Sequence, residues 1–280
     1  KRLGDIPVIA FFQGEDTFLD SLPEPYRTGC WDEMKERLVE CEMLIAPSRF
    51  YAGVMSKRLG ISQEKIEVLP NGINLEGYGR QPSDGPKAIG YLSRMCRDKG
   101  LGDMVDAYLL FQAKGNFPEC RLKIAGSCPP GDEPFVKEQK QKIETAGLSH
   151  LVDWKPNVSR EEKARFLGSL TIFSAPMRYA EAFGLCLVEA MASGVPVVNP
   201  GGSTFEEIAL VTGGGKTVSP GDPGLLACAW EELLGNPEEA TAMGERGRRG
   251  VEEHYSVKAM KDGFLKLAQR ACAKTASRQP

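Results

Sequence analysis

The stretch RYAEAFGLCLVEAMASGVPVV, residues 178–198, decides the fold class of this chain. It contains a helix-like run, Leu185–Ala192, and then a short apolar run of strand type, Val195–Val198. A second strand-like run, Thr171–Ser174, precedes the stretch. Short strands that alternate with helices over short loops are typical of parallel sheets covered by helices on both faces, so this stretch predicts an α/β fold.

The same alternation continues through the rest of the sequence. The expected strands are Pro7–Phe12, Met43–Ala46, Lys65–Leu69, Ala88–Leu92, Arg121–Ala125, Leu151–Trp154, Thr171–Ser174, Val195–Val198 and Lys216–Val218. The expected helices are Trp31–Glu40, Arg49–Leu59, Leu101–Gln112, Glu133–Thr145, Arg160–Leu167, Leu185–Ala192, Leu225–Leu234, Pro237–His254 and Val257–Lys274. The turn-rich residues 69–87 interrupt the alternation and mark a domain boundary. We therefore expect a first domain at 1–78, a second at 79–256, and a C-terminal helix within 257–280 that packs back towards the first domain.

Composition and charge narrow the classes of protein that this chain can belong to. Hydrophobic residues make up 41% and charged residues 26% of the 280 residues, as in ordinary globular proteins. The formal net charge of -3 gives no basic field for nucleic acid, and the apolar runs are too short to cross a bilayer, so we expect at most peripheral membrane contact. The eight cysteines contain no Cys-x-x-Cys pair and no secretory signal opens the chain, which favours reduced thiols in a cytoplasmic protein. With only two histidines, we expect no histidine-based metal site.

Two carboxylates stand out in the opening stretch, because Glu181 and Glu189 lie eight positions apart in a mostly apolar segment. Glu181 comes just before the expected helix and Glu189 lies within it, so helical rise separates them by about 12 Å at most. Between them, the backbone N–H groups of Phe183, Gly184 and Leu185 have no partner within the helix and suit an anion. This order of groups matches a nucleotide sugar. The first acid would accept the sugar hydroxyls, the N–H groups would bind the diphosphate, and the second acid would accept the ribose hydroxyls. The alternative is a helix-start acid and a solvated face residue, and this stretch alone leaves both interpretations open.

A second loop favours the nucleotide-sugar interpretation. AIGYLSRMCRDKGL, residues 88–101, predicts a strand, a loop with three cations, and a helix that begins near Gly100. Cations beside a helix amino terminus are repelled by the helix dipole unless an anion lies between them. A diphosphate would remove that conflict, with Arg94 binding bidentately and Lys99 acting as a point charge, whereas Arg97 has the character of an ordinary surface cation.

These motifs resemble those of the family-4 retaining glycosyltransferases, which have the GT-B fold of two Rossmann-like parallel-sheet domains. The spacing Glu181-x7-Glu189 is similar to the E-x7-E motif of that family. SRMCRDKG, residues 93–100, is similar to its Arg-x4-Lys-Gly phosphate loop. VLPNGIN, residues 68–74, is similar to its interdomain segment, except that Asn74 replaces the usual aspartate.

The resemblance implies a role for each of these residues. Arg94 and Lys99 would contact the donor diphosphate and stabilise the charge that develops on it as it leaves. Glu189 would hold the ribose, and Glu181 would hold the transferred sugar together with the backbone of residues 183–185. The implied reaction moves a hexose from a nucleoside-diphosphate sugar to an acceptor (a sugar, lipid or small molecule) with retained anomeric configuration, and it needs no cofactor and no metal.

Two features depart from the family pattern. Many members carry a histidine after the strand that matches Val8–Phe12, facing the transferred sugar, whereas this chain has Gln13, which can donate a hydrogen bond but cannot carry a proton. The strands and helices that normally open the acceptor domain are also missing, and the sequence does not begin with Met. We therefore expect a partial sequence with an incomplete first domain, which binds donor with little or no acceptor-dependent transfer.

Two other functions stay open beside hexosyl transfer. The first is a nucleotide-sugar binding module without catalysis. The second is a Rossmann-type oxidoreductase, which is disfavoured because Gly100-Leu101-Gly102 lacks the third glycine of a dinucleotide fingerprint. GGGKT, residues 213–217, is not a P-loop, because position 210 is leucine where that motif needs glycine.

Overall fold

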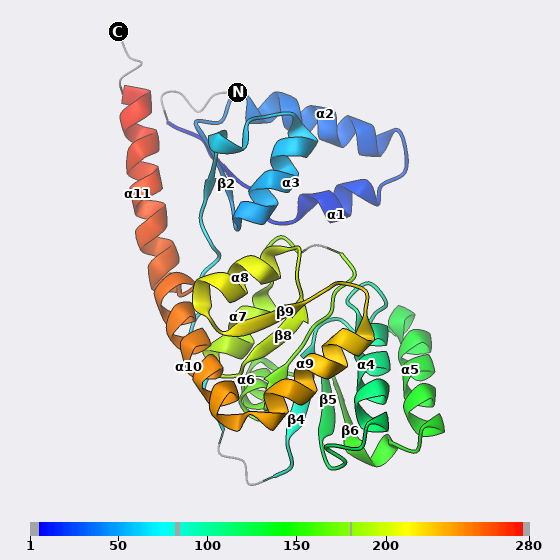
Figure 1. Ribbon diagram of the computed structural model, residues 1–280. Coiled ribbons are helices and arrows are strands. Elements are labelled where there is room, and N and C mark those ends of the chain that lie inside the picture. The colour runs from blue at the N-terminus through cyan, green and yellow to red at the C-terminus, as the bar shows by residue number, and fades with distance from the viewer. Residues whose placement is uncertain (1–5, 82–84, 180, 277–280) are drawn as a thin grey trace. The chain divides into compact units, whose positions relative to one another are not determined.

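The computed structural model describes residues 6–81, 85–179 and 181–276, the last three of these as backbone only. The chain divides into two units (Figure 1), each built on a parallel sheet, which confirms the predicted α/β class. Unit 1 comprises Lys1–Gly72, Glu181–Phe183 and His254–Pro280, and unit 2 comprises Ile73–Ala180 and Gly184–Glu253.

Unit 1 contains three strands in the order β1 (Ile9–Phe11), β2 (Met43–Ala46) and β3 (Ile66–Val68). Its helices are α1 (Glu15–Asp20), α2 (Tyr26–Leu38), α3 (Arg49–Leu59) and α11 (Val257–Ala276), with a 3-10 turn at Gln63–Lys65. Successive side chains of a strand point to opposite faces of its sheet. Accordingly, Leu44 and Ala46 of β2 lie in one core with residues of α1, α2 and α3, while Met43 and Ile45 lie in a second core with Leu267 of α11. The sheet of unit 1 is therefore covered on both faces.

Unit 2 contains a six-stranded parallel sheet in the order β6-β5-β4-β7-β8-β9. The strands are β4 (Ala88–Leu92), β5 (Arg121–Gly126), β6 (Val152–Pro156), β7 (Ile172–Phe173), β8 (Val197–Pro200) and β9 (Gly215–Val218). Numbered within the unit, this is the order 3-2-1-4-5-6 of nucleotide-binding Rossmann sheets. The order reverses between β4 and β7, so the loops that follow these two strands lead to opposite faces and leave a crevice at the carboxyl edge of the sheet.

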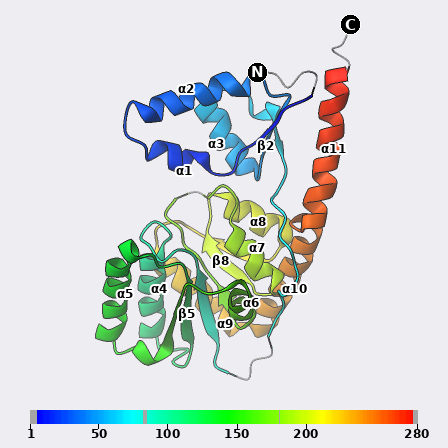
Figure 2. The ribbon, with the colours of Figure 1, turned by 180° about the vertical axis from the view of Figure 1, so that it is seen from behind.

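Helices cover both faces of the sheet in unit 2. Seen from the two sides (Figures 1 and 2), α4 (Leu101–Ala113), α5 (Glu133–Thr145) and α9 (Pro223–Gly235) lie on one face, and α6 (Arg160–Gly168), α7 (Leu185–Ala192) and α8 (Thr204–Thr212) lie on the other. The long helix α10 (Pro237–His254) follows α9, and 3-10 turns lie at Pro130–Asp132 and Ser149–Leu151. None of the described helices is long and apolar enough to span a bilayer.

Some elements differ from the sequence prediction. Helices α1 and α8 were not expected, and α2 begins at Tyr26, earlier than predicted. Helix α1 has six residues of which only Leu19 is buried, too few for a periodic pattern. The division between the units falls at Gly72, inside the turn-rich residues 69–87 but before the expected position 78. The C-terminal helix groups with unit 1.

Candidate functional site

The loops after β4 and β7 contact each other at the crevice in unit 2. Gly100 ends the first loop with φ +75°, and a Cβ atom there would overlap the carbonyl oxygen of Pro176 in the second loop. The Arg178 N–H donates to the Asp98 carbonyl over 3.0 Å, and the Arg178 guanidinium forms two hydrogen bonds of 2.7 and 2.8 Å with the Asp103 carboxylate. The loop that contains the first motif therefore contacts the loop that precedes the second motif.

The first of these loops carries the predicted cations. The Arg94 guanidinium donates from Nε and Nη2 to the Asp132 carboxylate over 2.6 and 3.2 Å, and this hydrogen bonding raises the pKa of Arg94 further above its ordinary value. The Lys99 ammonium lies 4.6 Å from the centre of the Tyr179 ring. The buried Tyr91 hydroxyl lies 3.0 Å from the carbonyl oxygens of both cationic residues, and burial raises the pKa of Tyr91 well above its ordinary value, so it remains a hydrogen-bond donor. The buried Tyr91 hydroxyl thus holds the backbone of this loop by hydrogen bonds to its carbonyl oxygens.

Arg97, the third cation of the loop, has a separate set of partners. Its guanidinium lies 4.8 Å from the centre of the Phe135 ring and 3.5 Å from the Glu138 carboxylate, both on α5. Arg97 is exposed to solvent, which agrees with its expected character as a surface cation.

The loop after β7 leads into α7, and among the described residues no side chain caps the amino terminus of this helix. Gly184 occupies the N-cap position with φ +91°, in the left-handed region that favours glycine. A Cβ atom on Gly184 would lie 2.6 Å from the Phe205 ring, so the backbone can pass there only without a side chain. The first residue of the helix, Leu185, is half-exposed. This helix end can therefore receive an anion through its backbone N–H groups.

Glu189 is buried in α7 and is not a solvated face residue, so the alternative interpretation of this residue is wrong. Only 6% of its surface is exposed. Its Oε1 atom accepts a 2.7 Å hydrogen bond from the Tyr78 hydroxyl and forms an ion pair with the Lys163 ammonium of α6. Burial, reinforced by the hydrogen bond to Glu189, raises the pKa of Tyr78 above its ordinary value, which keeps the hydroxyl protonated.

The remaining predicted residues group with unit 1. The Gln13 and Asn71 side-chain amides form two reciprocal hydrogen bonds of 2.8 and 3.2 Å. Ala182, the neighbour of Glu181, accepts a 2.9 Å hydrogen bond from the Ser48 hydroxyl and packs against the backbone of Gly14. The buried hydroxyl of Ser48 also caps α3.

The structure distributes the predicted site residues as follows. Unit 2 brings Arg94, Lys99, Gly184, Leu185 and Glu189 into one fold, whereas Gln13, Glu181 and Phe183 group with unit 1. Sequence reasoning missed Asp132, Tyr78 and Lys163, which contact predicted residues from 38, 111 and 26 positions away. Asp132 lies in the segment that connects β5 to α5, six positions after β5 ends, and this position could have indicated it, since that segment starts at the carboxyl edge of the sheet. The roles of the predicted residues stay predictions.

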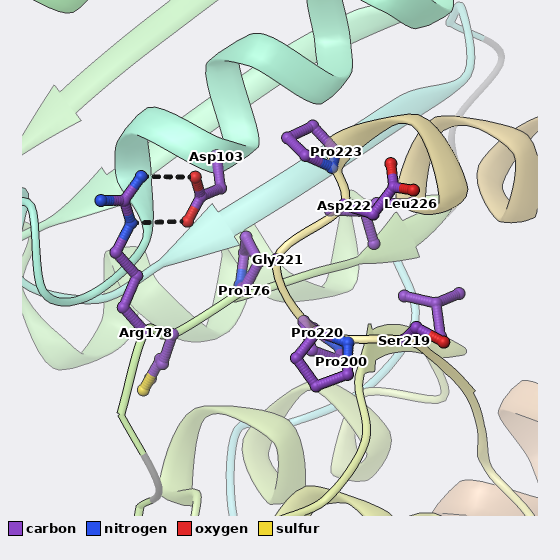
Figure 3. Close-up of a pocket in the computed structure, with 12 residues that line it drawn as sticks. Asp103, Pro176, Arg178, Pro200, Ser219, Pro220, Gly221, Asp222, Pro223 and Leu226 are labelled. Atoms are coloured by element: carbon purple, nitrogen blue, oxygen red, sulfur yellow. Dashed lines mark hydrogen bonds and ion pairs between the residues drawn. The ribbon is translucent and has the colours of Figure 1, made fainter.

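A cavity of about 420 Å³ lies beside the contact of the loops after β4 and β7, beyond the ends of β7, β8 and β9 (Figure 3). The ion pair of Arg178 and Asp103 forms one wall, and the turn that leads to α9 forms another. Proline side chains contribute much of the lining, at positions 176, 200, 220 and 223. Among the residues that the structure describes, no group of three or more histidines, cysteines and acids is placed to hold a metal ion. Independence from metal stays a prediction.

Comparison with known families gives matches over most of the chain. The model of the family described as glycosyl transferases group 1 matches residues 79–250. The model described as Glycosyltransferase Family 4 matches residues 1–76.

Curated relatives are similar over part of their own length. The MMP alpha-(1->4)-mannosyltransferase of Mycolicibacterium hassiacum is 26% identical over 250 residues, which cover 88% of this chain and 58% of the relative. The phosphatidyl-myo-inositol mannosyltransferase of Mycobacterium leprae is 30% identical over 182 residues, covering 63% of this chain and 46% of the relative. The chain therefore spans about half the length of these relatives.

Solved structures share the fold at low sequence identity. Anabaena HepE in complex with UDP and glucose superposes with a TM-score of 0.78 at 18% identity, covering 94% of this chain and 71% of that chain. The sucrose-phosphate synthase of Thermosynechococcus elongatus gives a TM-score of 0.77 at 21% identity, covering 95% and 68%. These likenesses confirm the predicted fold class, an α/β fold of GT-B type.

Proposed function

The chain belongs to the glycosyl transferases group 1 family, and we propose that it binds a nucleoside-diphosphate sugar and transfers the hexose with retained anomeric configuration. One observation supports this proposal most. The loop that carries Arg94 and Lys99 and the loop that leads to the uncapped amino terminus of α7 meet at the crevice where the strand order of unit 2 reverses. That crevice is where open α/β sheets bind phosphorylated ligands.

The diphosphate is the part of the donor that unit 2 would recognise most strongly. Arg94 and Lys99 supply two positive charges, and the first N–H groups of α7 supply donors without a charge. As the sugar leaves, negative charge accumulates on the diphosphate, and groups that are already in place stabilise that charge without having to reorganise. Asp132 orients the Arg94 guanidinium in the structure and would share it with a phosphate oxygen when the donor binds.

The sugar and the ribose would be held by the two glutamates. Glu181 stands three positions before the N-cap Gly184, so the chain itself leads from the acid to the anion site. Glu189 lies further along α7 and would accept hydrogen bonds from the ribose hydroxyls.

The proposed transfer needs a base, and Gln13 cannot be one. The acceptor oxygen forms its bond to the anomeric carbon as the bond from that carbon to the diphosphate oxygen breaks. The acceptor proton passes to the departing diphosphate on the same face of the sugar, so Gln13 acts only as a hydrogen-bond donor.

The names of relatives support this class of donor. Relatives include mannosyltransferases and a glycogen synthase, and the Anabaena structures contain UDP, glucose or UDP-glucose. We propose an enzyme whose acceptor is a sugar, a lipid or a small molecule, and, from the scattered cysteines, a cytoplasmic location. Gln13 also favours a second candidate function, a nucleotide-sugar binding module without transfer, because a histidine is the commoner residue at this position of the family pattern.

A binding panel followed by a turnover assay tests the proposal. Calorimetry with UDP, GDP, ADP and NAD⁺ should give binding of a nucleoside diphosphate, whereas binding of NAD⁺ alone would support a dehydrogenase instead. The matching nucleotide sugar is then incubated with the protein, and release of the nucleoside diphosphate is followed. Release that requires a hydroxyl acceptor supports transfer. Binding without release in a broad panel of acceptors supports the binding module only if a chain extended at its amino end also gives no release, because little transfer is expected from the partial sequence.

A further inference from the structure

The two oxygens of the Glu189 carboxylate have different surroundings. Both of its partners, the Tyr78 hydroxyl and the Lys163 ammonium, contact the same oxygen, Oε1. Within the residues that the structure describes, Oε2 accepts no hydrogen bond, yet it is not among the fully enclosed polar atoms that lack a partner. One oxygen is therefore occupied by the protein, and the other is open to an incoming donor.

The two partners come from different parts of unit 2 and meet at α7. Tyr78 lies in the segment before β4, and Lys163 lies in α6. The Lys163 side chain is 25% exposed and that of Glu189 is 8% exposed, so the pair is largely removed from water. A buried carboxylate needs a paired charge and hydrogen bonds to be tolerated, and these two residues supply both.

We propose that Lys163 is a positioning residue for nucleotide recognition, which together with Tyr78 orients Glu189 so that Oε2 accepts the ribose hydroxyls of the donor. This inference rests on the proposed function, since it assumes that a nucleoside diphosphate binds in unit 2. Lys163 itself does not touch the ligand. It holds Oε1, which leaves Oε2 as the acceptor for the sugar diol.

The readout is the preference for ribose, measured by calorimetry with two ligands. The ligands are UDP, or GDP or ADP if the panel selects one of them, and its 2′,3′-dideoxy form, which lacks both hydroxyls. In the unmodified protein the dideoxy form should bind about 10- to 100-fold more weakly, as expected when charged hydrogen bonds are lost. Lys163→Met should weaken binding of the ribose form and leave the dideoxy form within about threefold, so that the preference disappears.

Three further variants separate positioning from folding. Lys163→Arg keeps the charge and should restore most of the preference. Tyr78→Phe keeps the ring and removes one hydrogen bond, so it should reduce the preference even if Lys163→Met folds poorly. Lys142→Met, which breaks a more exposed ion pair of unit 2 with Asp106, is the control for loss of a lysine charge and should leave the preference unchanged.

Lys99→Ala distinguishes a failure of this inference from a failure of the proposed function. It should weaken both ligands by the same factor, because both carry the diphosphate. If Lys99→Ala weakens both ligands but neither Lys163→Met nor Tyr78→Phe reduces the ribose preference, the positioning role is wrong and the proposed function stands. If the unmodified protein binds no nucleoside diphosphate, or Lys99→Ala has no effect, the proposed function falls and this inference falls with it.

Discussion

Gly100 sits at the closest approach of the two loops that form the crevice, which makes Gly100→Ala a direct perturbation of the site. The residue has φ +75°, where an L side chain is strained by about 1–2 kcal/mol. The new Cβ atom would also overlap the Pro176 carbonyl oxygen, which is backbone and cannot rotate away. Forcing extra volume into a packed site typically destabilises by about 1–3 kcal/mol. We therefore expect Gly100→Ala to lower the free energy of unfolding by about 2–5 kcal/mol in total.

Gly147→Ala is the matched control for this prediction. Gly147 has φ +72°, almost the same as Gly100, but its added Cβ atom would meet nothing within 4 Å. The control therefore introduces the backbone strain without the overlap, and the difference of about 1–3 kcal/mol between the two variants measures the crowding alone.

Thermal unfolding and nucleotide calorimetry are the assays. In a unit of this size, each kcal/mol lowers the melting temperature by about 2–4 °C. Gly100→Ala should therefore melt measurably below Gly147→Ala, and it should also weaken nucleoside-diphosphate binding because the phosphate loop must move away from the second loop. Equal melting temperatures for the two variants would refute the close approach of the loops.

Three other predictions follow from individual residues. Gln139 is buried in α5 and, among the described residues, neither its oxygen nor its nitrogen has a partner, so Gln139→Leu should raise stability by about 1–3 kcal/mol, and a lower melting temperature would contradict this. Burial raises the pKa of Cys120 to about 12, so at pH 8 its thiol is almost wholly protonated, and iodoacetamide should label exposed Cys30 long before it. Equal labelling rates in the folded protein would show that Cys120 is accessible. Ser48→Ala removes both the cap of α3 and the hydrogen bond to Ala182, and should destabilise by about 1–2 kcal/mol in urea unfolding, whereas an unchanged free energy of unfolding would show that neither hydrogen bond contributes.

One of the helices that the sequence predicted to the residue has strong local signals at both ends. Arg49–Leu59 follows a serine cap and precedes Gly60 in the left-handed conformation, so residue types that favour helix ends mark both of its ends in the sequence. Helix α8 (Thr204–Thr212) was missed although it has the same end signals, a serine cap at Ser203 and Gly213 in the left-handed conformation, because the exposed apolar Leu210 and Val211 obscure its periodicity. Its buried face, which includes Phe205 and Ile208, becomes evident only once the sheet is assembled.

In the site, too, local sequence motifs predicted some features, whereas contacts between distant segments could not be predicted. Motif spacing was enough to predict that Arg94 and Lys99 would share a loop at the carboxyl end of a strand, and β4 ends at Leu92, just before that loop. It could not predict that Glu189 would be buried, because its partners Tyr78 and Lys163 are brought to α7 by packing of segments far apart in the sequence. The periodicity of one helix does not say which neighbours will cover it.

The most direct test of the account is nucleotide calorimetry on Lys99→Ala beside Arg97→Ala. Both cations lie in the same loop and both stand over an aromatic ring, at 4.6 Å for Lys99 and 4.8 Å for Arg97, but only Lys99 is expected to contact the diphosphate. Lys99→Ala should weaken binding of the nucleoside diphosphate by about 10- to 100-fold, while Arg97→Ala should leave it unchanged within about twofold. Equal losses in the two variants, or no loss for Lys99→Ala, would contradict a diphosphate site at this crevice.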